Sequence, residues 1–366
     1  MFFAYWFLGL PSQGATHIDP SLKWRTIETL HFKITYHDGL EEHAKRMASI
    51  AEETHSRLTP LFKYVPSMKT DVVLLDNTDF SNGLTSVFPN PLIIIYVADI
   101  GSNYQPYAYE EWLRYVFVHE YTHLLNLETI QPSAHLIRGL FGRMFFPNTL
   151  APMFIIEGYA TYMETVSGKG GRGNDPRYNA MMRMEALEGS FKSIEQASVR
   201  TVRWPMGSVP YLYGVNFFQY LDRKYGAAKI YKLSQYYGEY LFSGGIDSAF
   251  KHVFGSSLQD LWADWQKEEV KKAEEMKAVI MQEPLTKSVR LTSGGYYSLK
   301  PRWGDPDTVY FTEVNPGETS HMRKISVSTG RTEKVVEGTY LKRGVSLECV
   351  SSAIEAILFA CSSRPS

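Results

Sequence analysis

The most informative stretch of this 366-residue sequence is His119-Glu120-Tyr121-Thr122-His123. It lies in residues 110–128, which have helical composition and contain no Pro or Gly. Residues four apart lie on one face of a helix, so the two imidazoles can reach a single metal ion. Imidazole nitrogen is a good zinc ligand, and the glutamate beside the first histidine can accept a proton from a water on the metal. We therefore expect His119 and His123 to be metal ligands and Glu120 to be the general base.

A second apolar segment, residues 154–165, supplies a third ligand. Glu157 lies in this segment, with 33 residues between it and His123. A buried carboxylate is costly without a partner, and a metal ion provides one. Two histidines and one glutamate leave a position of zinc open for water or substrate, which is typical of catalytic sites. We expect one Zn²⁺ per chain, held by His119, His123 and Glu157; the alternative is a helix that carries two histidines without a metal.

The composition narrows the range of partners and places limits on disulfides. The sequence is 44% hydrophobic, and its formal net charge is -1. A charge so close to zero provides no broad basic field, so we expect neither nucleic acid nor a membrane surface as a partner. The two cysteines, Cys349 and Cys361, both lie near the C-terminus, which excludes a disulfide framework and a cysteine zinc cage in the main domain.

The N-terminus has the composition of an export signal. Residues 1–10 are apolar and are followed by Pro11 and small residues, but a basic segment before them is lacking. We expect residues 1–15 to be the remnant of such a signal and the protein to be exported. The alternatives are a start site placed too late and a frayed apolar terminus.

The order of apolar patterns predicts an α+β protein with a boundary near residue 285. Strand patterns at 31–37, 71–75 and 91–97 and a helix pattern at 39–64 come first, and a Gly-rich loop at 168–174 precedes a helical region. We expect one domain over residues 16–285 and a second segment over 286–366. The helices predicted after the loop cover residues 177–188, 210–224, 227–237 and 257–281, and the strands predicted after residue 285 cover 298–303, 308–314, 322–328 and 332–336.

Over about residues 25–280 the chain resembles the gluzincin zinc metallopeptidases, also called peptidase MA-like. The resemblance implies a small twisted sheet beside an active-site helix, a helical second lobe, and hydrolysis of peptide bonds by a metal-activated water. One position departs from it, because Thr161 stands where thermolysin-like relatives have an aspartate that orients a histidine. Thr161 itself or Glu164 is expected to take that role. The likeness rests on residues 119–123, 142–148 with Pro152, 157–162, 225–226, 254–256 and 261–265.

The resemblance also implies an edge strand that pairs with an extended peptide substrate. Residues 81–97 are the candidate, and we expect Asn82, Gly83 and Leu84 to contact the substrate. The alternative is an ordinary strand of the sheet. Residues 134–146 are apolar with two arginines and are expected to form a hairpin over the active site; the alternative is contact with a membrane surface.

Gluzincins often take an oxyanion donor from the helical lobe, either a tyrosine or a histidine, and two tyrosines compete for this role here. Tyr213 shares an apolar helical stripe with Phe217, Tyr220 and Leu221, which indicates packing. Tyr211 lies off that stripe at the start of the helix. We expect Tyr211 to be the donor and Tyr213 to be a core residue; the alternative is that both are core residues.

The C-terminal strands resemble one blade of a TolB-like β-propeller, on the evidence of residues 301–311 and 324–330. A propeller takes 4–8 blades, which about 80 residues cannot supply. We expect a partial propeller, in a fragment of a longer protein or in a chain with an aberrant end. The predicted function is that of a zinc-dependent peptidase acting on peptides or proteins. The alternative is a non-hydrolytic binding or scaffold protein with a peptidase-like fold.

Overall fold

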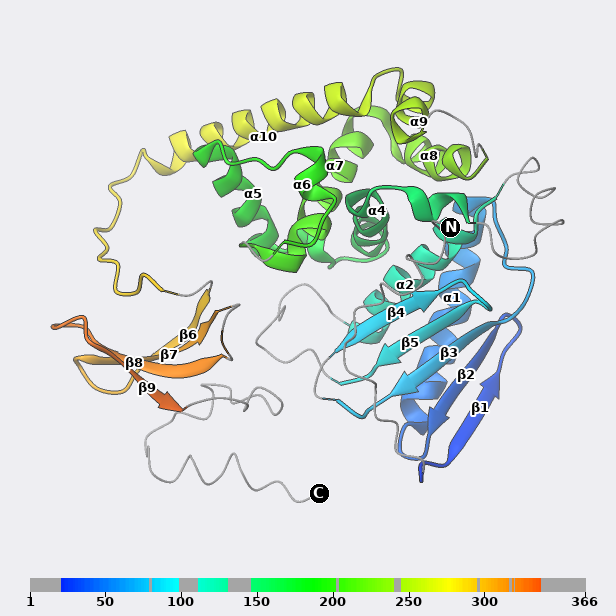
Figure 1. Cartoon of the computed structure of the whole chain (residues 1–366), viewed down its shortest axis with the longest axis horizontal. Coiled ribbons are helices and arrows are strands. Elements are labelled where there is room, and N and C mark those ends of the chain that lie inside the picture. Colours follow the sequence, from blue (N-terminus) through cyan, green and yellow to red (C-terminus); the bar gives the residue numbers. More distant parts are fainter. Residues whose placement is uncertain are drawn as a thin grey trace, which may run out of the picture.

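A computed structural model describes residues 21–78, 81–98, 111–130, 146–201, 204–239, 245–294, 297–315, 318 and 320–336. The described chain is a mixed α/β structure with a five-stranded sheet, a group of helices and a separate four-stranded sheet (Figure 1). The expected export signal at 1–15 and nearly all of the expected hairpin at 134–146 lie outside the described residues. Among the described helices, none is long and apolar enough to cross a membrane.

The first sheet has the strand order β1-β2-β3-β5-β4. Strands β2, β3 and β5 are parallel, whereas β1 and β4 pair antiparallel at the two edges. Buried and partly exposed residues alternate along β2 and β5, because successive side chains point to opposite faces of a sheet. The strands are β1 Trp24–Glu28, β2 Phe32–His37, β3 Thr70–Leu75, β4 Asn82–Ser86 and β5 Leu92–Tyr96.

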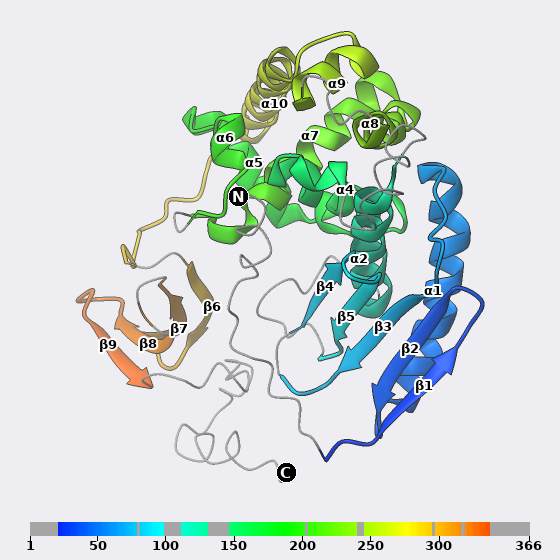
Figure 2. The same cartoon turned by 45° about the vertical axis from the view of Figure 1, so that its right-hand side comes forward.

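Two helices cover one face of this sheet (Figure 2). Helix α1 (Glu41–Phe62) buries a stripe that includes Met47, Ile50 and Leu58, at the spacing expected of an amphipathic helix. Helix α2 (Trp112–Glu128) packs beside α1 and against β4 and β5, and nearly all of its residues from Tyr115 onward are buried. A polar motif in α2 therefore lies in the interior of the molecule.

The helical lobe is centred on the crossing of α4 (Met153–Val166) and α7 (Val209–Tyr225). At this crossing, a Cβ atom added to Gly158 would lie 2.4 Å from Gly214 Cα, so the two backbones touch. This close approach brings α4 and α7 together beside α2. The remaining helices are α5 Pro176–Glu188, α6 Ile194–Ala197, α8 Ala227–Glu239, α9 Gly245–Phe254 and α10 Leu258–Ile280, with short 3-10 turns η1 Pro147–Leu150, η2 Arg172–Asn174 and η3 Met206–Ser208.

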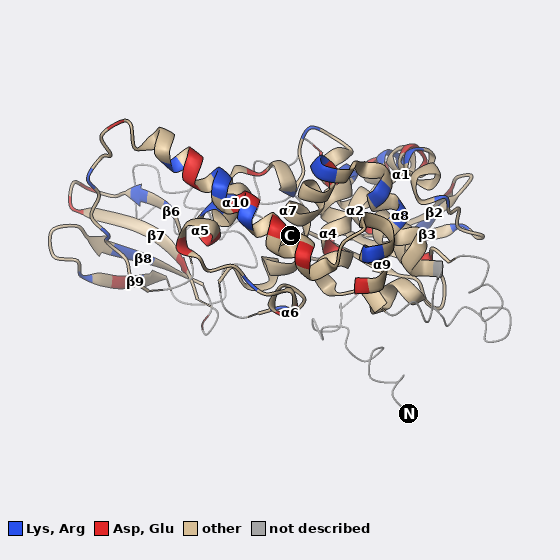
Figure 3. Ribbon diagram, turned by 90° about the horizontal axis from the view of Figure 1, so that it is seen from above, with Lys and Arg blue, Asp and Glu red and all other residues tan. Residues whose placement is uncertain are grey.

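Helix α10 has an apolar side and a charged side. Leu261, Trp262 and Trp265 are buried against the lobe, while acidic and basic residues alternate along the helix (Figure 3). Lys272 pairs with Glu269 on the charged side. An extended segment then leads from α10 to the second sheet (Figure 1).

The second sheet consists of β6 (Tyr297–Trp303), β7 (Thr308–Val314), β8 (His321–Ser326) and β9 (Thr332–Val336), each antiparallel to the next. Its own buried apolar cluster contains Val309, Phe311 and Ile325. The prediction of a partial propeller is not confirmed, since the described residues form a small four-stranded sheet and no propeller. The strand alternation in the sequence predicts a blade-like sheet but contains no information on closure.

Candidate metal centre

The three expected metal ligands converge from two buried helices, α2 and α4. His119 Nε2 lies 3.0 Å from His123 Nε2. Glu157 Oε2 lies 3.5 Å from His119 Nε2 and 3.2 Å from His123 Nε2. The three side chains are 8%, 11% and 13% exposed, so the site is nearly closed but reachable from solvent.

These three atoms are spaced as a zinc ion requires. Zinc–ligand bonds of about 2.0–2.1 Å at the tetrahedral angle separate neighbouring ligand atoms by roughly 3.3 Å. The observed separations are 3.0 to 3.5 Å. The buried Glu157 Oε2 also accepts no well-formed hydrogen bond from the described part of the chain, although buried carboxylate oxygens normally have a donor. The donor set and its spacing therefore fit zinc, with a position left for water or substrate.

Carboxylates face both ring nitrogens of His119. Burial lowers the pKa of His119, but Glu157 and Glu164 outweigh this effect and raise the pKa to about 9. Burial would raise the pKa of Glu157, whereas His123 and His119 lower it well below its ordinary value. The buried imidazoles and carboxylates of the centre thus stabilise each other's charged forms.

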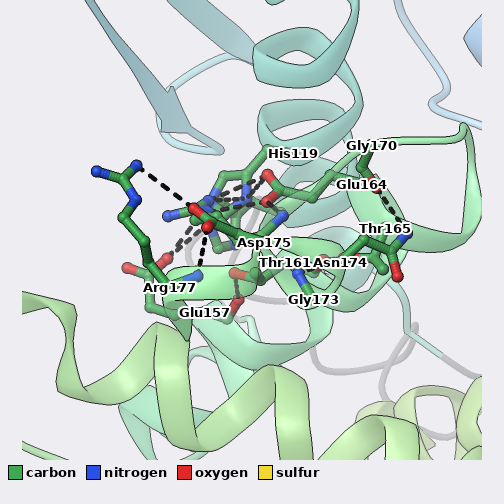
Figure 4. A network of polar contacts seen from close by, with 12 residues as sticks. His119, Glu157, Thr161, Glu164, Thr165, Gly170, Gly173, Asn174, Asp175 and Arg177 are labelled. Carbon is green, nitrogen blue, oxygen red and sulfur yellow. Dashed lines mark hydrogen bonds and ion pairs between the residues drawn. The ribbon is translucent and has the colours of Figure 1, made fainter. Parts of the chain in front are cut away.

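Glu164, rather than Thr161, is the partner of His119. Glu164 Oε2 lies 3.3 Å from His119 Nδ1 (Figure 4). Thr161 Oγ1 instead donates a hydrogen bond of 2.7 Å to the carbonyl of Glu157, within its own helix. A histidine that binds metal through Nε2 needs an acceptor for its Nδ1–H, and Glu164 Oε2 is a carboxylate oxygen close enough to take that role.

Two arginines near the centre were not found by sequence reasoning. Arg172 contacts Glu164 and lies 3.0 Å from His119 Nδ1, measured from Nη2. The half-exposed Arg200 places Nη2 4.0 Å from Glu157 Oε1. Both lie outside the long helices, where no apolar period marks which side chains face the centre. The Gly-rich loop at residues 168–174, which contains Arg172, was the sequence feature that could have pointed to this arginine.

Glu120 lies against the edge strand β4. Thr85 Oγ1 lies 2.7 Å from Glu120 Oε2 and donates a hydrogen bond to it. A Cβ atom on Gly83 would lie 2.5 Å from Glu120 Oε1, so the strand backbone closely approaches the carboxylate. Gly83 and Thr85 share one face of the strand, and Asn82 and Leu84 share the other. The structure thus places the expected substrate strand at the sheet edge next to Glu120.

The two tyrosines of α7 have different surroundings. The Tyr211 ring lies beside the His119 imidazole, with 6.0 Å between ring centroids. Burial and the nearby Glu157 raise the pKa of Tyr211, so its hydroxyl keeps its proton. The buried Tyr213 hydroxyl donates to Glu185 Oε2 at 2.7 Å and accepts from the Lys192 amide at 2.9 Å. Tyr211 therefore borders the metal centre, and Tyr213 is bonded into the core.

Comparison with known proteins gives distant likenesses. No family model matches the chain. An uncharacterized protein of Treponema pallidum (strain Nichols) is 29% identical over 244 residues, which are 65% of this chain and 21% of that protein. The matched region thus spans about a fifth of the length of this curated relative.

Some solved structures align with the chain at low similarity. An M1 zinc metallopeptidase from Deinococcus radiodurans aligns with a TM-score of 0.36 and 16% identity, over 67% of this chain and 51% of that one. An aminopeptidase N family protein from Idiomarina loihiensis aligns with a TM-score of 0.37 and 13% identity, over 86% of this chain and 66% of that one.

Proposed function

We propose that this chain is a zinc-dependent peptidase whose metal is held by His119, His123 and Glu157. The observation that supports this is the convergence of the three ligand atoms within 3.5 Å of one another, with Glu120 next to His119 on the same helix. Three protein ligands leave a position for a reacting water, which a structural zinc site does not. An edge strand beside Glu120 adds a surface on which an extended peptide can lie.

Each residue of the centre has a role in this proposal. Zinc would polarise the scissile carbonyl and lower the pKa of the attacking water. Glu120 accepts the proton of that water and passes it to the leaving amine, and Thr85 orients its carboxylate through the 2.7 Å hydrogen bond. Tyr211, which keeps its hydroxyl proton, donates a hydrogen bond to the oxyanion.

The substrate class in this proposal is a peptide or protein bound in extended form. The substrate adds to the edge of β4 that pairs with no described strand, where Asn82, Gly83 and Leu84 contact it. The half-buried side chains of β4 leave this strand partly accessible. Its position at the end of the sheet supports this mode of binding, because an edge strand has unpaired backbone groups on one side.

We also propose how the chain is divided into a signal, a peptidase domain and a propeller blade. Residues 16–285 form the peptidase domain, and the β6–β9 sheet within 286–366 is one blade of a β-propeller that needs further blades to close. The consecutive antiparallel order of β6 to β9 supports the assignment as a blade. Residues 1–15 act as an export signal, on the evidence of their apolar composition.

A digest of casein tests the activity, with wild-type protein and Glu120→Gln compared at equal zinc content. The wild type is expected to cleave, to stop with a chelator and to recover with added zinc. Glu120→Gln is expected to keep zinc and to lose about 10²–10⁴-fold in rate, because an amide cannot accept the water's proton. Equal rates for the two proteins would remove Glu120 from the mechanism. A zinc-loaded wild type that cleaves neither casein nor a peptide library would contradict the proposed activity and favour a binding or scaffold role.

A further inference from the structure

Arg172, at the start of η2, makes three hydrogen bonds to one buried carboxylate. Its Nε donates to Glu164 Oε1 at 2.8 Å, its Nη2 donates to Glu164 Oε2 at 3.1 Å, and its backbone amide donates to Oε1 at 3.1 Å. The Glu164 side chain is 2% exposed and that of Arg172 is 13% exposed. A buried carboxylate needs a partner of opposite charge, and the planar guanidinium binds both oxygens at once.

The same guanidinium lies against the metal ligand. Arg172 Nη2 is 3.0 Å and Glu164 Oε2 is 3.3 Å from His119 Nδ1. Arg172 Nη2 can only donate and Glu164 Oε2 can only accept, so the two groups favour opposite tautomers of His119, and only the tautomer that directs Nδ1–H to Glu164 leaves Nε2 free for metal. With the proton on Nδ1, the Nε2 lone pair of His119 faces His123 and Glu157, where the metal is expected. A Glu164 carboxylate held close to Nδ1 therefore favours the tautomer of His119 that binds metal through Nε2.

Arg172 also contacts the expected oxyanion donor. Its Cζ atom lies 4.6 Å from the centroid of the Tyr211 ring, at a distance typical of a cation–π contact. One guanidinium therefore touches the partner of a metal ligand on one side and the face of Tyr211 on the other. Arg172 links α2, α4 and α7 at the centre.

The backbone before Arg172 is built for this close approach. Gly171 has φ of +91°, which L side chains rarely adopt, and a Cβ atom there would lie 2.6 Å from Thr165 Cα. Gly173 donates its amide to Thr165 Oγ1 at 3.1 Å. The loop therefore lies tightly on α4, and this places the Arg172 side chain over Glu164.

We propose that Arg172 is a positioning residue of the metal centre: it holds Glu164 against His119 Nδ1 and thereby orients the imidazole for zinc. This inference rests on the metal centre of the proposed function and adds a residue to it. Its readout is zinc affinity, so a failure of the peptidase activity leaves the test intact.

The test is a chelator competition that measures the zinc dissociation constant of purified full-length variants. Arg172→Ala is expected to weaken zinc binding about 10- to 100-fold, the usual cost of losing an outer partner of a metal ligand. Arg172→Lys keeps the charge but loses the bidentate contact with Glu164, and we expect an intermediate loss of zinc affinity. Millimolar guanidinium is expected to restore part of the affinity of Arg172→Ala. Arg177→Ala removes an arginine that pairs with Asp175 at 3.5 Å and is the matched control, with wild-type affinity expected.

A double-mutant cycle separates positioning from general stability. If Arg172 acts through Glu164, the double variant of Arg172→Ala and Glu164→Gln binds zinc no more weakly than Glu164→Gln alone. If the losses of zinc affinity from Arg172→Ala and Glu164→Gln add up in the double variant, the inference is overturned. It is also overturned if Arg172→Ala and Arg172→Lys bind zinc as the wild type does and only lower the melting temperature of the zinc-free protein. If Arg172→Ala does not fold, Arg172→Lys decides, and wild-type affinity in that variant would overturn the role of the planar fork. A wild-type protein that binds no zinc would overturn both this inference and the proposed function.

Discussion

Gly83→Ala is expected to impair catalysis without removing the metal. An alanine Cβ at this position would lie 2.5 Å from Glu120 Oε1, 2.6 Å from Glu120 Cγ and 2.7 Å from Val116 Cγ2. Moving the first contact from 2.5 Å to an ordinary 3.4 Å requires a shift of 0.9 Å. A misplacement of about 1 Å in a reacting group can cost roughly 10²-fold in rate. We therefore expect kcat to fall about 100-fold in Gly83→Ala, with zinc content unchanged because the three atoms nearest to the added Cβ belong to Glu120 and Val116, neither of which is an expected metal ligand.

The assay is peptide hydrolysis at equal zinc content, below the melting temperatures of all variants. Gly207→Ala is the control, because a Cβ atom at Gly207 meets no described atom within 4 Å. A wild-type kcat in fully loaded Gly83→Ala would contradict the role expected of the close approach between β4 and Glu120. A loss of zinc in this variant would show instead that the substitution disturbs the whole centre.

Three further substitutions test the helical lobe. Tyr211→Phe should lower kcat by about 10²–10³ with zinc unchanged, the cost of losing one oxyanion donor, whereas a normal kcat would remove Tyr211 from the mechanism. Tyr213→Phe should lower the free energy of unfolding by about 1–3 kcal/mol in urea denaturation, because the buried Glu185 loses the hydroxyl that donates to it at 2.7 Å. A strongly reduced kcat with normal stability in this variant would reverse the roles of Tyr211 and Tyr213. Gly158→Ala should destabilise the protein by about 1–3 kcal/mol, because its Cβ would lie 2.4 Å from Gly214 Cα, and an unchanged melting temperature would contradict the backbone contact between α4 and α7.

Helical spacing predicted the placement of the histidines because it is a local property. Two residues four apart on one helix must lie on one face, and the structure places the two Nε2 atoms 3.0 Å apart. The same reasoning separated Tyr211 from Tyr213, since only Tyr213 lies on the apolar stripe of α7. Glu157 was expected from the cost of a buried carboxylate, and it lies 3.2 Å from His123.

Contacts that depend on loops or on tertiary packing were not predicted. Arg172 and His119 are 53 residues apart in sequence, and the turn that carries Arg172 has no period that indicates its direction. The contact between Thr85 and Glu120 follows from the alternation of side chains along β4 only once Gly83 is known to face Glu120. Strand β1 was missed because almost all of its side chains are exposed, so no apolar alternation marks it.

Metal analysis of purified protein, comparing the wild type with Glu157→Ala and His123→Ala, tests the proposed centre most directly. Each substitution removes a ligand atom, so the wild type should contain about one zinc per chain and both variants should lose most of it. Glu120→Gln, which removes no ligand, should keep the wild-type zinc content. A folded wild-type preparation without divalent metal near neutral pH, or variants with undiminished zinc, would contradict the assignment of His119, His123 and Glu157 as a zinc centre.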